Sequence, residues 1–214
     1  MIVDERMSAF INSFAAPLPD YLNELEQYSI ETNVPIIRKE MQTLMSFLLK
    51  MNRPLNVLEV GTAIGFSSLF MKENLPGESK ITTIEKYEKR IPMARENFKK
   101  HDLNHQITLL EGDATEVLKS LDGPYDFIFM DAAKGQYINF YPEIKRLLKK
   151  GGVLLSDNVM QDGDILESRY AVIRRNRTIY SRMRDYLYEL THSDDLKTVI
   201  LPVGDGVTIS VKEK

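Results

Sequence analysis

The fold is decided by residues 57–67, VLEVGTAIGFS. Apolar and β-branched residues that lead into a glycine are typical of a short buried strand, which here ends at Gly61. The residues that follow are small, and a helix is predicted from residue 66 to residue 75. Small residues before a helix let a ligand approach backbone N–H groups closely. The loop matches neither the G-x-G-x-x-G dinucleotide pattern nor the Gly-Lys-Ser/Thr of a P-loop, and a plain tight turn stays open.

Strand and helix alternate along the chain on either side of this loop. Five such repeats are typical of a parallel sheet that is covered on both faces. Two further apolar runs flank Val203-Gly204-Asp205-Gly206, which predicts a closing antiparallel hairpin. We therefore expect an α/β fold with a mostly parallel, seven-stranded sheet. Its strands are predicted at 55–60, 80–84, 107–110, 125–130, 152–156, 198–201 and 207–211, and its helices at 66–75, 88–101, 114–121, 138–149 and 170–192.

The start of the chain follows another pattern. Helices are predicted over residues 4–14, 20–31 and 36–51, with a break at Pro17-Leu18-Pro19. We expect an N-terminal helical segment at 1–33, followed by one domain at 34–214.

Composition narrows the class of protein. The 214 residues are 43% hydrophobic and 28% charged, and the chain is long enough to fold without a disulfide or a metal. It has no Cys, which excludes thiol catalysis, a zinc ribbon and an iron–sulfur site. No apolar run approaches the length of a membrane span, and the N-terminus lacks the features of a signal peptide. We expect a cytoplasmic protein with no membrane association.

Acidic residues stand at the ends of five successive predicted strands. Because parallel strands end at one edge of a sheet, these carboxylates should converge there and need a compensating cation or hydrogen-bond donors. The first three predict a nucleoside pocket, in which Glu85 would bind ribose hydroxyls and Asp113-Ala114 would accept from an adenine amino group. A cationic nucleoside such as S-adenosylmethionine suits this pocket better than NAD or ATP. Glu85 beside a helix dipole and Asp113 as an N-cap are the structural alternatives. The residues concerned are Glu59 with Gly61, Glu85, Asp113, Asp131, and Asp157 with Asn158.

The last two strand ends predict a metal site. Asp131, Asp157 and Asn158 offer hard oxygen ligands, which suit Mg²⁺ or another divalent cation that keeps positions open for substrate. A turn or a helix cap is the alternative for Asp157-Asn158. Lys134 follows Asp131 by three residues, and a charged ammonium is disfavoured beside a divalent cation. Lys134 is therefore a candidate general base, with a solvated loop lysine as the alternative.

These residues together resemble a known family. The stretches 57–67, Gly112-Asp113-Ala114, 130–134 and 156–159, together with Glu85, are similar to the class I, cation-dependent O-methyltransferases of the catechol and caffeoyl-CoA type. The resemblance implies a Rossmann-like methyltransferase fold, S-adenosylmethionine and Mg²⁺ as cofactors, and a homodimer in which the N-terminal helices form contacts or wall the substrate site. It implies cofactor contacts at Ile37, Glu59, Gly61, Ser67, Glu85, Asp113, Ala114 and Asp131, metal ligands at Asp131, Asp157 and Asn158, and a catalytic role for Lys134 and Asp131.

Three shorter stretches sharpen this resemblance. Residues 33–37, 131–137 and 202–206 are most similar to the bacterial tRNA 5-hydroxyuridine methyltransferases within the family. The resemblance implies methylation of the 5-hydroxyl of the tRNA wobble uridine to give 5-methoxyuridine. A 5-hydroxyuracil and a catechol both offer two adjacent oxygens, so the metal site accepts either one. A small vicinal-diol phenol is therefore the alternative substrate, and a non-catalytic nucleotide-binding or RNA-binding module is the alternative class.

Arginine content favours RNA over a small phenol. Net charge is −3, but residues 169–184 hold six Arg and no acid, so the rest of the chain carries −9. An anticodon stem-loop needs such a basic footprint, and Arg174, Arg175 and Arg177 are the candidate contacts. The alternative is a helix whose long arginines cover apolar surface. Tyr137, Tyr141, Tyr170 and Tyr180 are candidates for stacking on bases.

Overall fold

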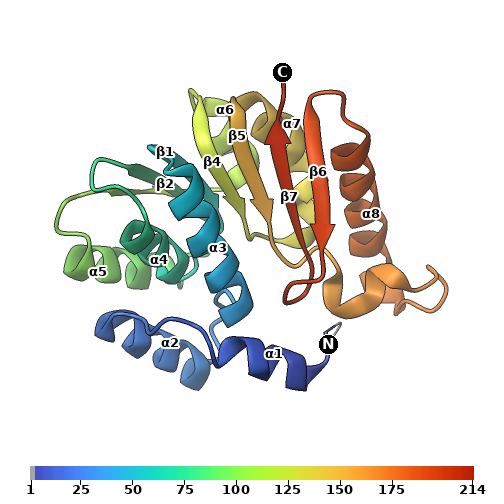
Figure 1. Ribbon diagram of the computed structural model, residues 1–214. Coiled ribbons are helices and arrows are strands. Elements are labelled where there is room, and N and C mark those ends of the chain that lie inside the picture. The colour runs from blue at the N-terminus through green and yellow to red at the C-terminus, as the bar shows by residue number, and fades with distance from the viewer. Residues whose placement is uncertain (1–2) are drawn as a thin grey trace. The chain divides into compact units, whose positions relative to one another are not determined.

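The computed structural model describes residues 3–214 (Figure 1). Its strands follow the order β3-β2-β1-β4-β5-β7-β6 in one seven-stranded sheet, which confirms the predicted fold class. The chain divides into two compact units, Arg6–Ala114 (the N-terminal unit) and Thr115–Lys214 with residues 3–5 (the C-terminal unit), each described by itself. The predicted division after residue 33 stays a prediction, and residues 1 and 2 of that segment lie outside the described residues.

The N-terminal unit contains three parallel strands and their helices. Register pairs Val60 with Ile84 and Glu85 with Glu111, so the carboxyl ends of the strands lie at one edge. Helices α4 and α5 pack on β2 and β3 respectively. The elements are α2 (Asp20–Thr32), α3 (Lys39–Asn52), β1 (Asn56–Val60), α4 (Phe66–Asn74), β2 (Lys80–Glu85), α5 (Ile91–His101) and β3 (Ile107–Glu111).

The first N-terminal helix differs from the next two in burial. Helix α1 (Glu5–Asn12) has no buried residue, whereas α2 and α3 bury apolar side chains such as Leu22 and Met45. Helix α3 begins at Lys39, three residues later than predicted, because the backbone of Arg38 is extended, at φ −68° and ψ 159°.

The C-terminal unit contains the other four strands. Strands β4 and β5 are parallel, and β7 pairs antiparallel with both β5 and β6, as predicted for a closing hairpin. Helix α7 packs on β4 and β5, and α8 packs on α7 and β6. The elements are α6 (Ala114–Ser120), β4 (Tyr125–Met130), the 3₁₀ turn η1 (Lys134–Gln136), α7 (Tyr137–Leu147), β5 (Leu148–Ser156), η2 (Gln161–Leu166), η3 (Arg174–Asn176), α8 (Arg177–His192), β6 (Leu196–Leu201) and β7 (Val207–Lys212).

Other helix predictions were also wrong at their ends. The predicted helix 88–101 begins only at Ile91, and the predicted helix 4–14 ends at Asn12. The predicted helix 138–149 ends at Leu147, because Leu148 pairs with Tyr125 as the first residue of β5. The predicted helix 170–192 begins only at Arg177, and Ile173 before η3 is extended, at φ −53° and ψ 133°. The Arg177 guanidinium donates to the carbonyls of Val172 and Tyr170 at 3.0 and 3.1 Å, which closes a loop where helix was expected.

Among the helices within residues 3–214, none combines the length and the apolar character that crossing a bilayer requires.

Candidate cofactor and metal sites

The loop between β1 and α4 is a tight turn built on positive φ angles. Gly61, Ala63 and Gly65 have φ of 107°, 48° and 88°. The N–H groups of Gly61 and Thr62 both donate to the carbonyl of Ile84, at 3.0 and 3.2 Å. A Cβ on Gly65 would lie 2.6 Å from the ring of Phe98, so only glycine fits at the start of α4. The loop therefore brings backbone close to the space where the sequence places the cofactor.

Glu85 organises this loop. Its carboxylate is buried and accepts N–H bonds from Ala63 at 2.7 Å, Lys86 at 2.9 Å and Tyr87 at 2.8 Å. A carboxylate offers about four lone-pair sites, so one remains for a ribose hydroxyl. The structural and the cofactor-binding interpretations of Glu85 are therefore compatible.

Glu59 has a structural function that the sequence did not reveal. The side chain is 0% exposed and accepts hydrogen bonds from the hydroxyls of Ser68 and Thr83, the latter at 2.5 Å. It thus ties β1 to β2 and α4 beneath the loop. A buried carboxylate needs such donors. Its predicted contact with the cofactor stays a prediction.

The other predicted cofactor residues, apart from Asp131, lie in the same unit. Asp113 is paired with Lys86 at 3.1 Å, and both side chains are about half exposed. Ser67 and Ala114 are buried, at 8% exposure each. Ile37 is also buried, and its carbonyl accepts from Gln42 Nε2 at 3.1 Å.

The predicted metal ligands lie together in the C-terminal unit. Asp131 follows β4 and Asp157 follows β5, two neighbouring parallel strands. Asn158 has a left-handed φ of 58°, and its Nδ2 lies 3.5 Å from Asp131 Oδ1. Rotation of this amide about χ2 would present Oδ1 to a cation instead. Within residues 3–214 no three His, Cys, Asp or Glu side chains form a metal-binding group, so the set depends on the Asn158 amide.

The electrostatics of this pair fit a cation. The pKa of Asp157 is raised to about 7, mostly by burial and in part by the nearby Asp131 charge, while the Asn158 N–H and Lys134 oppose the rise. Burial also raises the pKa of Asp131, and the Lys134 charge opposes this rise. Two neighbouring carboxylates that resist ionisation, one buried and one partly buried, are an environment that a divalent ion stabilises. Asp131, Asp157 and Asn158 therefore fit a divalent cation.

Lys134 is held beside this pair by its neighbours. It opens η1, immediately before Gly135, whose carbonyl accepts from Arg182 Nη1 of α8 at 3.1 Å. A Cβ on Gly135 would lie 3.5 Å from Ile179, so α8 packs closely on this turn. The turn that carries the candidate base is thus fixed by α8.

The turn between β6 and β7 holds the segment after the metal ligands. The N–H groups of Val159 and Met160 donate to the carbonyls of Gly206 and Asp205, both at 3.0 Å. Asp205 Oδ1 also accepts from the N–H of Asp162 at 2.6 Å. Sequence reasoning missed this function, although it singled out residues 202–206.

The arginines of residues 169–184 fall into two groups. Arg177, Arg182 and Arg184 donate to backbone carbonyls, so the predicted RNA contact Arg177 has a structural function. Arg169, Arg174 and Arg175 are exposed. Tyr170 is 88% exposed, whereas the other candidates for stacking on bases, Tyr137, Tyr141 and Tyr180, are buried.

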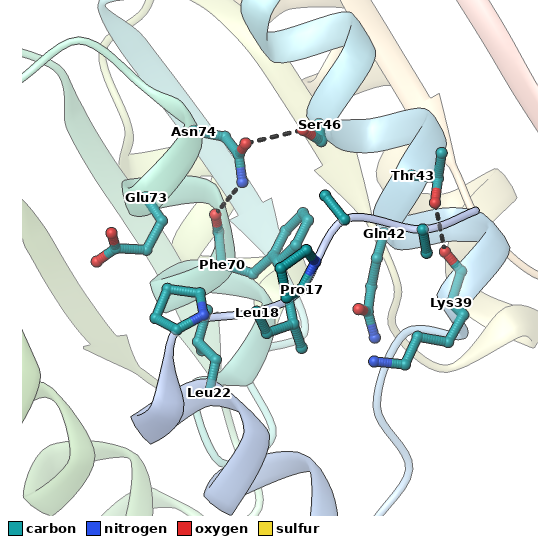
Figure 2. A pocket seen from close by; sticks show the side chains of 13 residues that line it. Pro17, Leu18, Leu22, Lys39, Gln42, Thr43, Ser46, Phe70, Glu73 and Asn74 are labelled. Atoms are coloured by element: carbon teal, nitrogen blue, oxygen red, sulfur yellow. Dashed lines mark hydrogen bonds between the residues drawn. The ribbon is translucent and has the colours of Figure 1, made fainter. Parts of the chain in front are cut away.

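A cavity of about 260 Å³ lies elsewhere, between residues 15–19, α3 and α4 of the N-terminal unit (Figure 2). Leu18, Leu22 and Phe70 line it, and the polar side chains around it bond to protein partners. Ser46 donates to Asn74 Oδ1 at 2.8 Å, for example. None of the predicted site residues lines this cavity, and we assign it no part in the reaction.

Comparison with known proteins identifies the family. A family model described as O-methyltransferase matches residues 12–213, and the chain belongs to this family. A caffeoyl-CoA O-methyltransferase of Medicago sativa is 34% identical over 179 residues, 77% of this chain and 70% of the relative. Caffeoyl-CoA O-methyltransferase 2 of Populus trichocarpa is 30% identical over 207 residues, which cover 89% and 81% respectively.

Solved methyltransferase structures are similar to this chain over nearly its whole length. A candidate caffeoyl-CoA O-methyltransferase from Staphylococcus aureus has a TM-score of 0.89 at 30% identity and covers 98% of this chain and 100% of its own. The SAH-bound Podospora anserina methyltransferase PaMTH1 has a TM-score of 0.87 at 28% identity, with 98% and 95% coverage. The protein is thus an S-adenosylmethionine-dependent O-methyltransferase of the caffeoyl-CoA type family.

We predict that divalent-metal affinity rises with pH. Because metal binding requires both carboxylates ionised and the folded pKa of Asp157 is raised to about 7, protons compete with the metal below that pH. Apparent affinity should fall by up to about tenfold per pH unit between pH 7 and pH 6, and level off above pH 8. Calorimetric Mg²⁺ titrations in buffers of different ionisation enthalpy would measure both the affinity and the protons released. A flat profile with no proton release would contradict the assignment.

Proposed function

We propose that the protein methylates the 5-hydroxyl of 5-hydroxyuridine at the wobble position of tRNA, with S-adenosylmethionine as donor and Mg²⁺ or another divalent cation bound. The supporting observation is the basic, aromatic segment 169–175 in the same unit as the metal ligands. Its exposed members are Arg169, Tyr170, Arg174 and Arg175. The segment leads into α8, which contacts the Lys134 turn. Arginine for phosphates and an exposed ring for stacking suit an RNA loop.

The chemistry requires an acceptor with two adjacent oxygens. When bound, a divalent cation would lower the pKa of the acceptor hydroxyl and offer open positions to both oxygens. Asp131, Asp157 and Asn158 would hold that cation. In a 5-hydroxyuracil the two oxygens are the 5-hydroxyl and the 4-carbonyl.

Lys134 would act as the general base. Methyl transfer forms an O–C bond as the S–C bond of the donor breaks, and the hydroxyl proton passes to Nζ of Lys134. The fixed position of the η1 turn against α8 serves this step, because general bases act only within hydrogen-bond reach of the proton. Glu85 and the Gly61–Gly65 loop would hold the donor nucleoside.

A small vicinal-diol phenol is the second candidate acceptor. The observation in its favour is that the curated relatives named above are caffeoyl-CoA O-methyltransferases. Coenzyme A carries phosphates, so exposed arginines would also suit a CoA thioester. Free catechol has no such group and provides the discriminating comparison.

We predict that the protein transfers labelled methyl from S-adenosylmethionine to tRNA bearing 5-hydroxyuridine, and that EDTA abolishes the transfer. Charge reversal in R174E/R175E should lower kcat/KM for tRNA by about 10- to 100-fold and reduce the log–log salt slope by about 2, because two phosphate contacts are lost. K150E/K197E makes the same change of charge at exposed positions of the same unit and should have little effect.

Parallel reactions with catechol and caffeoyl-CoA decide between the acceptors. Label in a phenol but not in tRNA would show that the protein methylates small molecules and would contradict the tRNA proposal. Equal tRNA activity in R174E/R175E and wild type would remove segment 169–175 from the interface.

We predict that Lys134→Ala lowers kcat by about 10²- to 10⁴-fold, the contribution of a positioned general base. Affinity for S-adenosylhomocysteine, measured by calorimetry, should stay within twofold of wild type. Lys150→Ala, an exposed lysine of the same unit, is the control. Full methylation by Lys134→Ala would exclude it as the base.

We also propose a homodimer that forms through α1. Met7, Phe10 and Ile11 have the i, i+3, i+4 spacing of one face of α1, Phe14 lies in the turn that follows the helix, and the four side chains are 48–74% exposed. A face of this kind is typical of an association surface. The proposal concerns a second copy of the chain.

We predict that F10E/F14E converts a dimeric wild type into a monomer in sedimentation velocity, because each charge would have to be buried in an apolar contact. Leu103→Glu is the matched control, since Leu103 is an exposed apolar residue (77%) away from α1. A wild type that is monomeric at micromolar concentration, or a double variant that stays dimeric, would contradict the prediction.

A further inference from the structure

Tyr137 lies directly behind the two carboxylates of the proposed metal site. Its side chain is 0% exposed, at the start of α7. The phenol oxygen lies 3.0 Å from the carbonyl oxygen of Met130 and 3.1 Å from that of Asp157. A phenol has one proton, so the two carbonyls share it in a three-centre bond.

These two carbonyls lie one residue apart in register at the ends of neighbouring strands. Met130 is the last residue of β4, immediately before Asp131, and Asp157 immediately follows β5. The register pairs Met130 with Ser156, and the N–H of Asp157 donates to the Met130 carbonyl at 3.0 Å. The Tyr137 hydroxyl therefore ties the strand ends together at the point where both carboxylates begin.

The ring of Tyr137 is itself held in place. It makes an edge contact with Tyr186, at 5.4 Å between ring centroids and 81° between planes. The Tyr186 hydroxyl lies 2.6 Å from Ser156 Oγ, within β5. Because α7 and α8 both contribute a ring, the hydroxyl of Tyr137 has little freedom to leave its two acceptors.

We propose that Tyr137 is a positioning residue for the divalent cation. Its phenol hydroxyl fixes the spacing of Asp131 and Asp157. The inference rests on the metal site of the proposed function. Two carboxylates that converge repel each other when both ionise, and this repulsion acts to separate the strand ends. A clamp on the backbone carbonyls opposes the separation and keeps the ligands spaced for the ion before it binds.

The test compares Tyr137→Phe with wild type by Mn²⁺ titration of EDTA-stripped protein, with free Mn²⁺ followed by electron paramagnetic resonance. We expect the Kd for Mn²⁺ to rise about 10-fold or more, the range found when support of metal ligands is removed. Affinity for S-adenosylhomocysteine should stay within twofold. Tyr141→Phe removes another buried phenol of α7, whose hydroxyl lies 3.4 Å from the Glu189 carbonyl, and should leave the Mn²⁺ affinity unchanged.

A conservative replacement separates the hydroxyl from the ring. 3-Fluorotyrosine at position 137 keeps the ring and its O–H donor and should restore the Mn²⁺ Kd to within twofold of wild type. If Tyr137→Phe is unfolded at 25 °C, the titrations are repeated at 10 °C with saturating S-adenosylhomocysteine, which stabilises the native state by mass action.

Two outcomes would contradict the proposed function of Tyr137 but not the metal site. One is a folded Tyr137→Phe variant that binds Mn²⁺ with wild-type affinity. The other is an equal loss of Mn²⁺ affinity in Tyr137→Phe and Tyr141→Phe. A wild-type protein that binds no Mn²⁺ would overturn the proposed metal site and the clamp with it.

Discussion

Repulsion between the carboxylates of Asp131 and Asp157 is the constraint around which the C-terminal unit is arranged. Burial alone raises the pKa of each group, and the charge of one raises the pKa of the other. Lys134 and the Asn158 N–H act in the opposite direction, but neither is an ion that bridges the pair. Such a pair is stabilised either by a proton or by a bound cation, which makes this edge of the sheet the candidate site for cation binding.

In the N-terminal unit, donors of the chain itself stabilise the carboxylates near the strand ends. Glu59 and Glu85 are also buried at or near strand ends, yet hydroxyl donors of the chain bond to one oxygen of Glu59, and backbone N–H donors bond to both oxygens of Glu85. Their negative charge is used to fix the loop and its neighbouring elements. Acids at strand ends thus have two different functions in this protein, and the donors around each acid distinguish them.

This difference sets the limit of what the sequence could predict. Period and breaker residues were enough to locate every strand, because buried parallel strands are short apolar runs between polar turns, although β5 begins at Leu148 and not at residue 152 as predicted. The acids at the strand ends could be found for the same reason. The donors could not, since Thr83 lies 24 residues from Glu59, and Tyr137 lies 20 from Asp157. Arg177 bonds to carbonyls five and seven residues earlier, and this contact overrides a local pattern that favours continuous helix.

The arginines of residues 169–184 divide into some that bond to backbone carbonyls and others that extend into solvent, and the proposed choice of substrate depends on this difference. Arg177, Arg182 and Arg184 hold residues 165–172, the η1 turn and α8 together, so their charges serve the fold whatever the acceptor is. Arg169, Arg174 and Arg175 extend from that framework into solvent. The ion site and the base would treat a 5-hydroxyuracil and a catechol alike, because both present the same pair of oxygens. Discrimination between the two acceptors must therefore come from contacts with the rest of each substrate. Exposed guanidinium groups increase the affinity for a polyanion such as tRNA but not for free catechol. In this protein the chemistry and the specificity are thus expected to be separable by mutation.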